Sequence, residues 1–388
     1  MPGADAGAAA DPAAVRLLAS LVLGDVDPSG LAPRDAASLA VLAVEQGLGP
    51  VLLAAARAAG VEPAGSPWAP LLDYDRWAGA RYLASRAEQV RIEAALAPLA
   101  IEWVWLKGYA LAHSVYPRPA LRPMLDLDIL VPAERCAEAE HALRAAGYLS
   151  EDAPPMYPGV ERSQHHLEHL RSPGGIILEV HMRLHPSERL LPPRELAWFR
   201  ARTMETRAAG VVVRHFTPEA QLLHLCGHAI LQHGEGDLRL QRFYDCHLLI
   251  AQTLRFDWRA LLDQAARLGW SYAIDRMLTR THDYFRTVIP DEVWHELRHA
   301  GSGDPKATWA RKVAVALEGK GAASAIARAR AFAPSPLFAL YQGLRVLVPS
   351  PAYMRWRYGP KARVLPFAYV RRWFEIARKL RGPNRPRG

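Results

Sequence analysis

The stretch Met124–Val131, MLDLDILV, alternates acidic and apolar side chains in the way that is typical of a half-buried β-strand. Because successive side chains of a strand point to opposite faces, Asp126 and Asp128 share one face. Two such residues have Cα atoms roughly 6.5 to 7 Å apart, so both carboxylates can approach the same divalent cation. An isolated Asp-x-Asp is also compatible with one aspartate facing solvent or capping a turn.

A second apolar run, Gly175–Met182 with the sequence GIILEVHM, carries Glu179 and His181 on one face of another predicted strand. A charged side chain at the centre of an apolar run needs a partner. A metal ion held together with the two aspartates would provide one, and the resulting three-carboxylate site would suit Mg²⁺. An arginine such as Arg183 is the alternative partner.

A turn follows the β-rich run Ile101–Leu106, where Lys107 and Gly108 lead into a helix predicted over Tyr109–Val115. Glycine permits a close backbone approach, the amide groups at a helix start bind phosphate, and Lys107 adds a positive charge. Strand-to-helix turns also use glycine for geometry alone. The pair therefore gains its significance from its position shortly before the two aspartates.

Helical periodicity surrounds this β-rich part of the sequence on both sides. Apolar residues recur every three or four positions up to about Leu99 and again from Thr217, and we expect helix starts at Asp11 and Ser66, each followed by proline. The last β-rich run between the helical parts is VVVRHF. We predict an α+β fold with an N-terminal helical region (1–99), an α/β core (100–216), a C-terminal helical domain (217–345) and a basic tail (346–388).

The composition is that of an ordinary globular protein and excludes a disordered or fibrous chain, because 50% of the 388 residues are apolar and only 22% are charged. The first residues lack the basic start of a secretory signal, and apolar runs end well before the ~20 residues of a membrane-spanning helix. The three cysteines, Cys136, Cys226 and Cys246, lie far apart and predict neither disulfides nor a CxxC metal site. We expect a cytoplasmic protein without a transmembrane segment.

The positive charge is concentrated at the C-terminal end. From Arg345 onward the chain has twelve basic residues and one acid, Glu375, which accounts for more than the whole net charge of +9. Residues 366–380 predict a helix with an apolar face through Phe367 and Phe374 and a basic face opposite. This helix could rest on an anionic membrane surface, contact nucleic acid or another acidic partner, or pack on the body with its basic face solvated.

Two groups of histidines lie near these motifs. His166, His169 and His181 could edge a cleft or contact an acceptor, or be ordinary strand histidines, and the sequence shows no His-Glu-x-x-His or cysteine pair to favour zinc. His224 and His228 share a helix face. Together with the acidic and basic residues of the next segment they could border a nucleotide pocket, although buried polar residues are the default interpretation. The residues of that segment are Asp237, Arg242 and Asp245.

The order of these motifs resembles the polymerase-β-like nucleotidyltransferase superfamily. Within it, residues 105–131, WLKGYALAHSVYPRPALRPMLDLDILV, and residues 177–185, ILEVHMRLH, are most similar to the bacterial "uncharacterised nucleotidyltransferase" family, whose pattern is LKG, a Tyr-Pro pair, Arg and Asp-x-Asp. The resemblance covers about Ile101–His185, and a weaker similarity extends over the predicted helices from Pro218 to roughly Trp270. It implies a small mixed nucleotidyltransferase sheet with flanking helices.

The resemblance also assigns residues. Gly108 matches the glycine of the nucleotide-binding turn, Asp126 and Asp128 match the metal-binding pair, and Glu179 matches the third strand carboxylate. Lys107, Tyr116 and Arg122 match positions of the narrower family's pattern. Many superfamily members have Ser or Gly where this chain has Tyr109. This chain therefore lacks a serine hydroxyl at that position to bind the terminal phosphate. The residues expected to contact the nucleotide are Lys107, Gly108, Tyr109, Arg122 and His181.

The implied activity is transfer of a nucleoside monophosphate from a triphosphate such as ATP to an acceptor hydroxyl or phosphate. Two Mg²⁺ (or Mn²⁺) ions at Asp126, Asp128 and Glu179 would stabilise the in-line transfer, with Glu179 also placed to take the acceptor's proton. Relatives of this kind suggest a small-molecule or peptide acceptor. The alternatives are a toxin-like transferase acting on RNA and a non-catalytic nucleotide-binding module.

Overall fold

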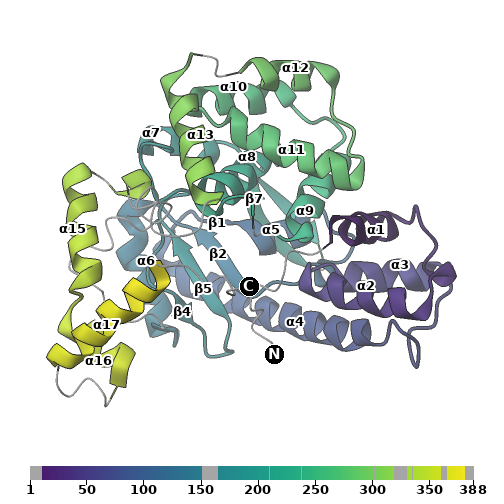
Figure 1. Ribbon diagram of the computed structural model, residues 1–388, viewed down its shortest axis with the longest axis horizontal. Helices are drawn as coiled ribbons and strands as arrows, with labels where there is room; N and C mark the ends of the chain where they lie inside the picture. The colour runs from purple at the N-terminus through teal and green to yellow at the C-terminus, as the bar shows by residue number, and fades with distance from the viewer. Residues whose placement is uncertain are drawn as a thin grey trace, which may run out of the picture.

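The computed structural model describes residues 11–150, 165–208, 210–236, 238–300, 303–318, 330–333, 335–359 and 365–380. A mixed sheet lies at the centre, with helices from both ends of the chain around it (Figure 1). The N-terminal helices lie on one side of the sheet, and most C-terminal helices lie above it in this view. The predicted α+β class with a small mixed sheet is confirmed.

The central sheet has five strands in the order β1-β2-β5-β4-β3. Their bounds are Val104–Trp105 (β1), Asp126–Leu130 (β2), Leu149–Ser150 (β3), Leu170–Arg171 (β4) and Ile177–His181 (β5). The central strands β2 and β5 are parallel, and the other neighbouring pairs are antiparallel. The register pairs Asp126 with Ile177 and Asp128 with Glu179. The two acid-bearing runs of the sequence are therefore neighbouring strands.

A separate hairpin packs beside β1 and is formed by β6 (Thr203–Ala208) and β7 (Val211–Phe216). The sequence predicts β7 through its valines but gives no signal for β6. The reason is that Met204, Glu205 and Arg207 are all exposed, so β6 lacks the apolar alternation by which half-buried strands are found.

The N-terminal helices are α1 (Pro12–Leu23), α2 (Pro33–Glu45), α3 (Gly49–Ala58) and α4 (Pro70–Leu96). Asp11 caps α1 as predicted, because its carboxylate accepts a hydrogen bond from the Ala13 amide at 3.0 Å. The prediction of a helix start at Ser66 is wrong by three residues, because the N-cap of α4 is Ala69. The Ser66 hydroxyl instead accepts from the Trp68 amide at 3.2 Å and forms a turn that precedes α4.

Two large hydrophobic cores hold most of the molecule together, and a small third cluster forms around Met354, Tyr358 and Ala368. One lies around the sheet and is shared by β2, β5, the long helix α4, α5 (Lys107–Ser114) and α6 (Cys136–Ala145). The other joins the N-terminal helices to the C-terminal ones, with α1 against α11. The remaining helices are α7 (Pro193–Arg200), α8 (Pro218–His228), α9 (Leu240–Ala251), α10 (Trp258–Leu268), α11 (Ser271–Phe285), α12 (Asp291–His299) and α13 (Pro305–Glu318). The division of the chain into four parts stays a prediction.

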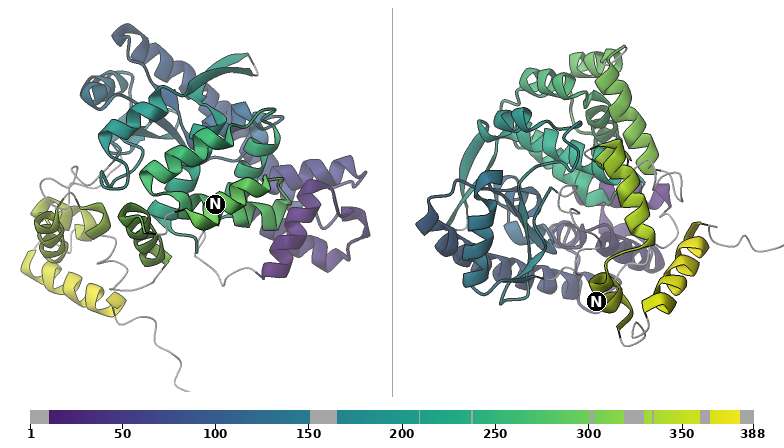
Figure 2. Two further views of the ribbon diagram at one scale, coloured as in Figure 1. Left: turned by 90° about the horizontal axis from the view of Figure 1, so that it is seen from above. Right: turned by 90° about the vertical axis from the view of Figure 1, so that its left-hand side faces the viewer.

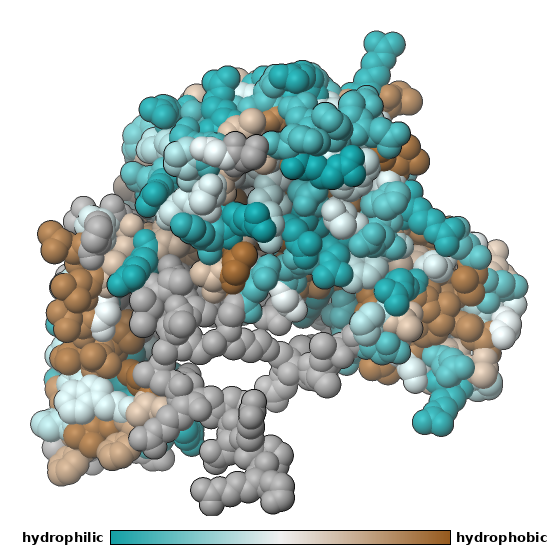
Figure 3. Space-filling view, turned by 45° about the horizontal axis from the view of Figure 1, so that its top comes forward, coloured by the Kyte–Doolittle hydropathy of each residue, from teal (hydrophilic) through white to brown (hydrophobic). Residues whose placement is uncertain are grey.

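The last three helices stand at the opposite end of the molecule from α1–α3 in Figure 1 and in the left view of Figure 2. They are α15 (Pro336–Leu347), α16 (Pro351–Tyr358) and α17 (Leu365–Leu380). Their outer surface is a patch of apolar side chains, visible as the brown edge at the left of Figure 3. Across the described ranges, no helix combines the length and the apolar character needed to cross a membrane.

Candidate active site

Asp128 and Glu179 lie side by side on the two parallel strands, and their side chains point to the same face of the sheet. His181 completes this group: its Nε2 lies 2.9 Å from Asp128 Oδ1 and 3.2 Å from Glu179 Oε2. The three residues offer ligand atoms that all lie within 4.8 Å of one another. Asp128 and His181 are buried, while Glu179 is half-buried. Glu179 does not pair with Arg183, whose guanidinium binds Glu188 at 2.7 Å.

Lys107, the first residue of α5, reaches this group from the turn that follows β1. Its Nζ lies 2.6 Å from Asp128 Oδ1 and 3.5 Å from Glu179 Oε2. The backbone of Lys107 has a φ of 45°, in the left-handed region, which costs a residue other than glycine roughly 1–2 kcal/mol. The turn thus keeps a strained lysine at the point where the acids converge, and such strain concentrates at functional sites.

The charges of the group shift one another's pKa values. Burial alone would raise the pKa of Glu179, but hydrogen bonds from His169 and His181 and the charge of Lys107 lower it well below the usual range. Burial would lower the pKa of Lys107, but Asp128 and Glu179 outweigh that effect and raise it. Glu179 is therefore ionised and Lys107 charged at neutral pH.

Asp126 lies two residues before Asp128 on the same face of β2. Burial, together with the charges of Asp128 and Glu179, raises the pKa of Asp126 to about 6. The Asp126 carboxylate is therefore close enough to Asp128 and Glu179 for their charges to raise its pKa. Its oxygens do not belong to either group of three close metal-ligand atoms that the described residues form, so its role as a metal ligand stays a prediction.

Arg122 is held by an ion pair with Asp245, and its expected contact with phosphate stays a prediction. Its Nε and Nη2 donate to the two carboxylate oxygens of Asp245 on α9, at 2.9 and 2.7 Å. The Tyr116 hydroxyl donates to the same carboxylate at 2.8 Å. This buried network joins the Tyr-Pro and Arg positions of the sequence motif to α9, which lies more than a hundred residues later in the sequence.

The two residues after Lys107 have different surroundings. Gly108 packs under the Arg122 guanidinium so closely that a Cβ atom there would lie 2.7 Å from Arg122 Nη1, which explains the glycine without a ligand. The ring of Tyr109 is fully buried, and its hydroxyl donates to Gln89 of α4. The expected contact of the Tyr109 side chain with a nucleotide is therefore wrong: this side chain belongs to the core.

Helices α8 and α9 bring further positive and neutral groups toward the carboxylates. His224 and His228 are buried, which lowers the pKa of both, and the charge of Lys107 lowers them further. Arg242 lies 3.4 Å from His228 Nδ1. Burial lowers the pKa of Arg242, as does the charge of Arg122, while Asp245, Asp126 and Asp128 act in the opposite direction. Arg242 thus borders the acidic group, whereas Asp237 lies outside the described residues.

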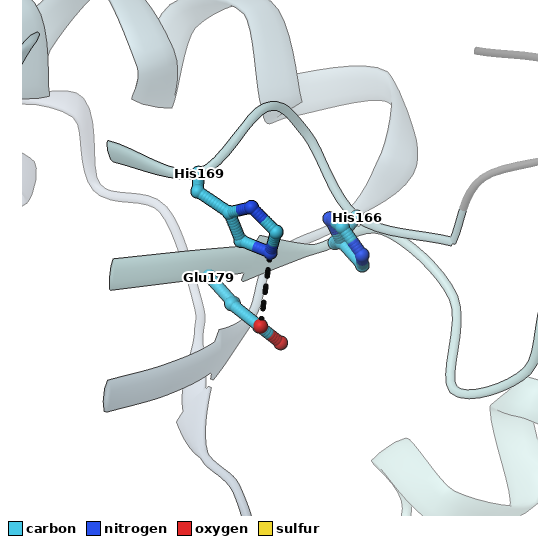
Figure 4. Close-up of side chains that lie close together, drawn as sticks. All are labelled: His166, His169 and Glu179. Carbon is cyan, nitrogen blue, oxygen red and sulfur yellow. Dashed lines mark hydrogen bonds and ion pairs between the residues drawn. The ribbon is translucent and has the colours of Figure 1, made fainter. Parts of the chain in front are cut away.

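A second group of possible ligands shares Glu179. His169 Nε2 lies 3.1 Å from Glu179 Oε1, and the rings of His166 and His169 stack with centroids 5.0 Å apart (Figure 4). The nearest atoms of His166, His169 and Glu179 also lie within 4.8 Å of one another. Spacing in the sequence could not show this assembly, because His166 and His169 precede β4 while Glu179 lies on β5.

A mixed sheet that gathers acidic side chains on two parallel strands beside a strand-to-helix turn defines a nucleotidyltransferase-like protein. The chain belongs to the family described as "uncharacterised nucleotidyltransferase", which matches residues 32–286. A search of curated proteins returned no match. Among solved structures, the crystal structure of an antigenic nucleotidyltransferase-like protein from Paracoccidioides brasiliensis is 15% identical, and the match covers 53% of this chain and 95% of that chain with a TM-score of 0.32.

Proposed function

We propose that this protein transfers a nucleoside monophosphate from a nucleoside triphosphate to an acceptor hydroxyl or phosphate on a small molecule or peptide, with release of pyrophosphate. The observation that carries the proposal is the register of β2 and β5, which places Glu179 beside Asp128 on neighbouring parallel strands. Membership of a nucleotidyltransferase family supports the general reaction.

The residues present fit a hard divalent cation. Three carboxylates approach one another, and both Lys107 and His181 contact two of them, Asp128 and Glu179. Burial, together with the charges of Asp128 and Glu179, raises the pKa of Asp126 to about 6, so a cation beside these carboxylates would favour their ionised forms. Carboxylates, together with water and substrate phosphates, are the ligands of Mg²⁺, and Mn²⁺ accepts the same oxygens. Asp126, Asp128 and Glu179 would hold one or two such ions, which supply charge stabilisation at the attacking and leaving oxygens.

Residues around the carboxylates have different proposed roles in the reaction. Glu179, whose pKa is lowered, is suited to hold a cation and is a weak proton acceptor, so we do not assign it the proton transfer. Lys107 and Arg242 carry positive charge beside the acids and are placed to orient the phosphates. Arg122 acts through Asp245 and Gly108: it fixes the turn that carries Lys107 against α9.

The activity test is incubation of the full chain with each of the four ribonucleoside triphosphates, Mg²⁺ and cell extract. We expect pyrophosphate release that requires Mg²⁺, and mass spectrometry should find one class of molecule that gains a nucleoside monophosphate. An excess of EDTA should remove both signals. The same extract contains RNA, so a labelled RNA would identify the toxin-like alternative.

The non-catalytic alternative gives a different result in a parallel measurement. Calorimetry would then show binding of a triphosphate in the presence of Mg²⁺, while pyrophosphate release stays at the level of the Mg²⁺-free control for all four nucleotides. That combination would contradict the proposed transfer and leave a nucleotide-binding module.

We also propose that the α15–α17 region docks on an anionic membrane surface. The predicted apolar face of α17 does not pack on the body: the side chains of Phe367 and Phe374 are both 73% exposed. Arg372, from the predicted basic face, is instead buried and donates to the Val346 carbonyl at 2.9 Å. The leucines of α15 add to the same exposed surface, with Leu337 80% exposed. Packing, which the sequence also allowed, is therefore wrong for this face.

The positive charge of this region favours an anionic membrane as the partner of that surface. An apolar patch alone would fit many partners, but the segment from Arg345 onward carries twelve basic residues and a single acid. Exposed aromatic side chains beside arginines and lysines are the combination that inserts at an anionic bilayer surface. Each basic residue near such a surface contributes about 1 kcal/mol, a contribution that salt screens.

Vesicle flotation tests the docking. The full chain should float with vesicles that contain phosphatidylglycerol and remain at the bottom with pure phosphatidylcholine, because the attraction needs anionic lipid. Phe367→Ser combined with Phe374→Ser should abolish flotation. As a matched control, Leu254→Ser with Val288→Ser removes two apolar residues elsewhere that are even more exposed, and this variant should float like the wild type. Equal recovery on both vesicle types, or no recovery on either, would contradict the proposal.

A further inference from the structure

The two carboxylate oxygens of Glu179 face different groups. Oε2 faces the proposed nucleotidyltransferase centre, at 3.2 Å from His181 Nε2 and 3.5 Å from Lys107 Nζ. Oε1 faces away from that centre, at 3.1 Å from His169 Nε2. The ring of His166 lies beside His169, so two imidazoles and one carboxylate oxygen gather on the second side of Glu179 (Figure 4).

The backbone holds these three side chains in place. Glu179 is the central residue of β5, and His169 directly precedes β4, which pairs with β5. His166 is fixed by an antiparallel bridge to His181. Sites on strands keep their geometry better than sites on free loops. The three ligand atoms are therefore preorganised to within 4.8 Å of one another.

The ring of His166 is also oriented. Its Nδ1 lies 2.6 Å from the Leu167 carbonyl, and since a carbonyl only accepts, Nδ1 carries the hydrogen and Nε2 carries the lone pair. Metal-binding histidines characteristically donate their second nitrogen to a carbonyl or carboxylate in this way, which fixes the ring toward the ion.

The ligand chemistry differs from that of the three-carboxylate centre. Imidazole nitrogens suit zinc and other transition metals, whereas Mg²⁺ prefers oxygen. Two histidines and one glutamate, with further positions open to water, form the ligand set of a known class of zinc centre. We propose that His166, His169 and Glu179 bind a transition-metal ion of the Zn²⁺ type, at a site distinct from the Mg²⁺ site and joined to it through Glu179.

Cobalt absorption tests this site without any need for turnover. Titration of the full, metal-stripped chain with Co²⁺ should produce visible ligand-field bands that saturate at one ion per chain and disappear on addition of Zn²⁺, but persist in excess Mg²⁺. His166→Gln with His169→Gln should abolish the bands and weaken Zn²⁺ binding by at least about tenfold. His295→Gln with His299→Gln, which removes an exposed and stacked histidine pair on α12, should leave both unchanged.

A second measurement avoids variants altogether. X-ray absorption of the wild-type chain with one equivalent of Zn²⁺ should show two imidazole ligands and otherwise oxygen. A shell of oxygen alone, or cobalt bands that survive in the His166/His169 variant or vanish in the His295/His299 control, would overturn the proposal. Because none of these readouts involves a nucleotide, they can succeed where nucleotidyl transfer fails, and the reverse.

Discussion

Asp126→Asn combined with Asp128→Asn should reduce Mg²⁺-dependent pyrophosphate release by about a thousandfold or more, while the protein remains folded. The substitution keeps the size of both side chains and removes the charges that hold the cation. Metal stabilisation of transition-state charge contributes several kcal/mol, and each 1.4 kcal/mol corresponds to a factor of ten in rate. Circular dichroism should show unchanged helix content, because Lys107 keeps Glu179 as a counter-charge 3.5 Å away when Asp128 becomes neutral.

The matched control for this variant is Asp283→Asn combined with Asp291→Asn. Both residues are exposed on α11 and α12, so the control removes the same number of charges at a distance from the sheet. Its rate of pyrophosphate release should equal that of the wild type. A double variant at positions 126 and 128 that retained the wild-type rate would remove these carboxylates from the mechanism.

Asp245→Asn should lower the free energy of unfolding by about 3–5 kcal/mol, which is typical when one partner of a buried ion pair is removed. The Arg122 guanidinium is only 10% exposed and donates twice to Asp245. The neutral amide would leave it without a counter-charge in the interior. Urea denaturation followed by circular dichroism measures the difference.

Two further variants show whether the loss of stability comes from leaving the buried Arg122 charge unpaired. Arg122→Met with Asp245→Leu replaces both partners with apolar side chains and should recover most of the stability. Asp73→Asn breaks an exposed pair with Arg76 on α4 and should change stability little. If Asp245→Asn were as stable as the wild type, the ion pair between Arg122 and Asp245 would not contribute to stability.

The parts of the fold that the sequence predicts are those with a local signal. The alternation around Asp126 and Asp128 gives the strand and its acidic face. Asp11 gives the start of α1 through its cap. The exposed strand β6 and the start of α4 are missed, because one lacks alternation and the other follows a proline turn that resembles a cap.

The parts of the site that depend on tertiary contacts could not be predicted. The sequence predicts that Glu179 shares a metal ion with the aspartates, because its charge needs a partner, but only the parallel register of β2 and β5 places Glu179 beside Asp128. The capture of Arg122 by Asp245 joins residues 123 positions apart. The sequence also does not show that one carboxylate oxygen of Glu179 contacts His181 while the other contacts His169.

Anomalous diffraction from crystals grown with Mn²⁺ and a non-hydrolysable nucleoside triphosphate tests the central claim most directly. We predict a manganese peak bonded to carboxylate oxygens of Asp128 and Glu179, with Asp126 binding the same ion or a second one and the α-phosphate completing the coordination. A nucleotide whose phosphates and manganese bind elsewhere, with all three carboxylates uncoordinated, would contradict the account.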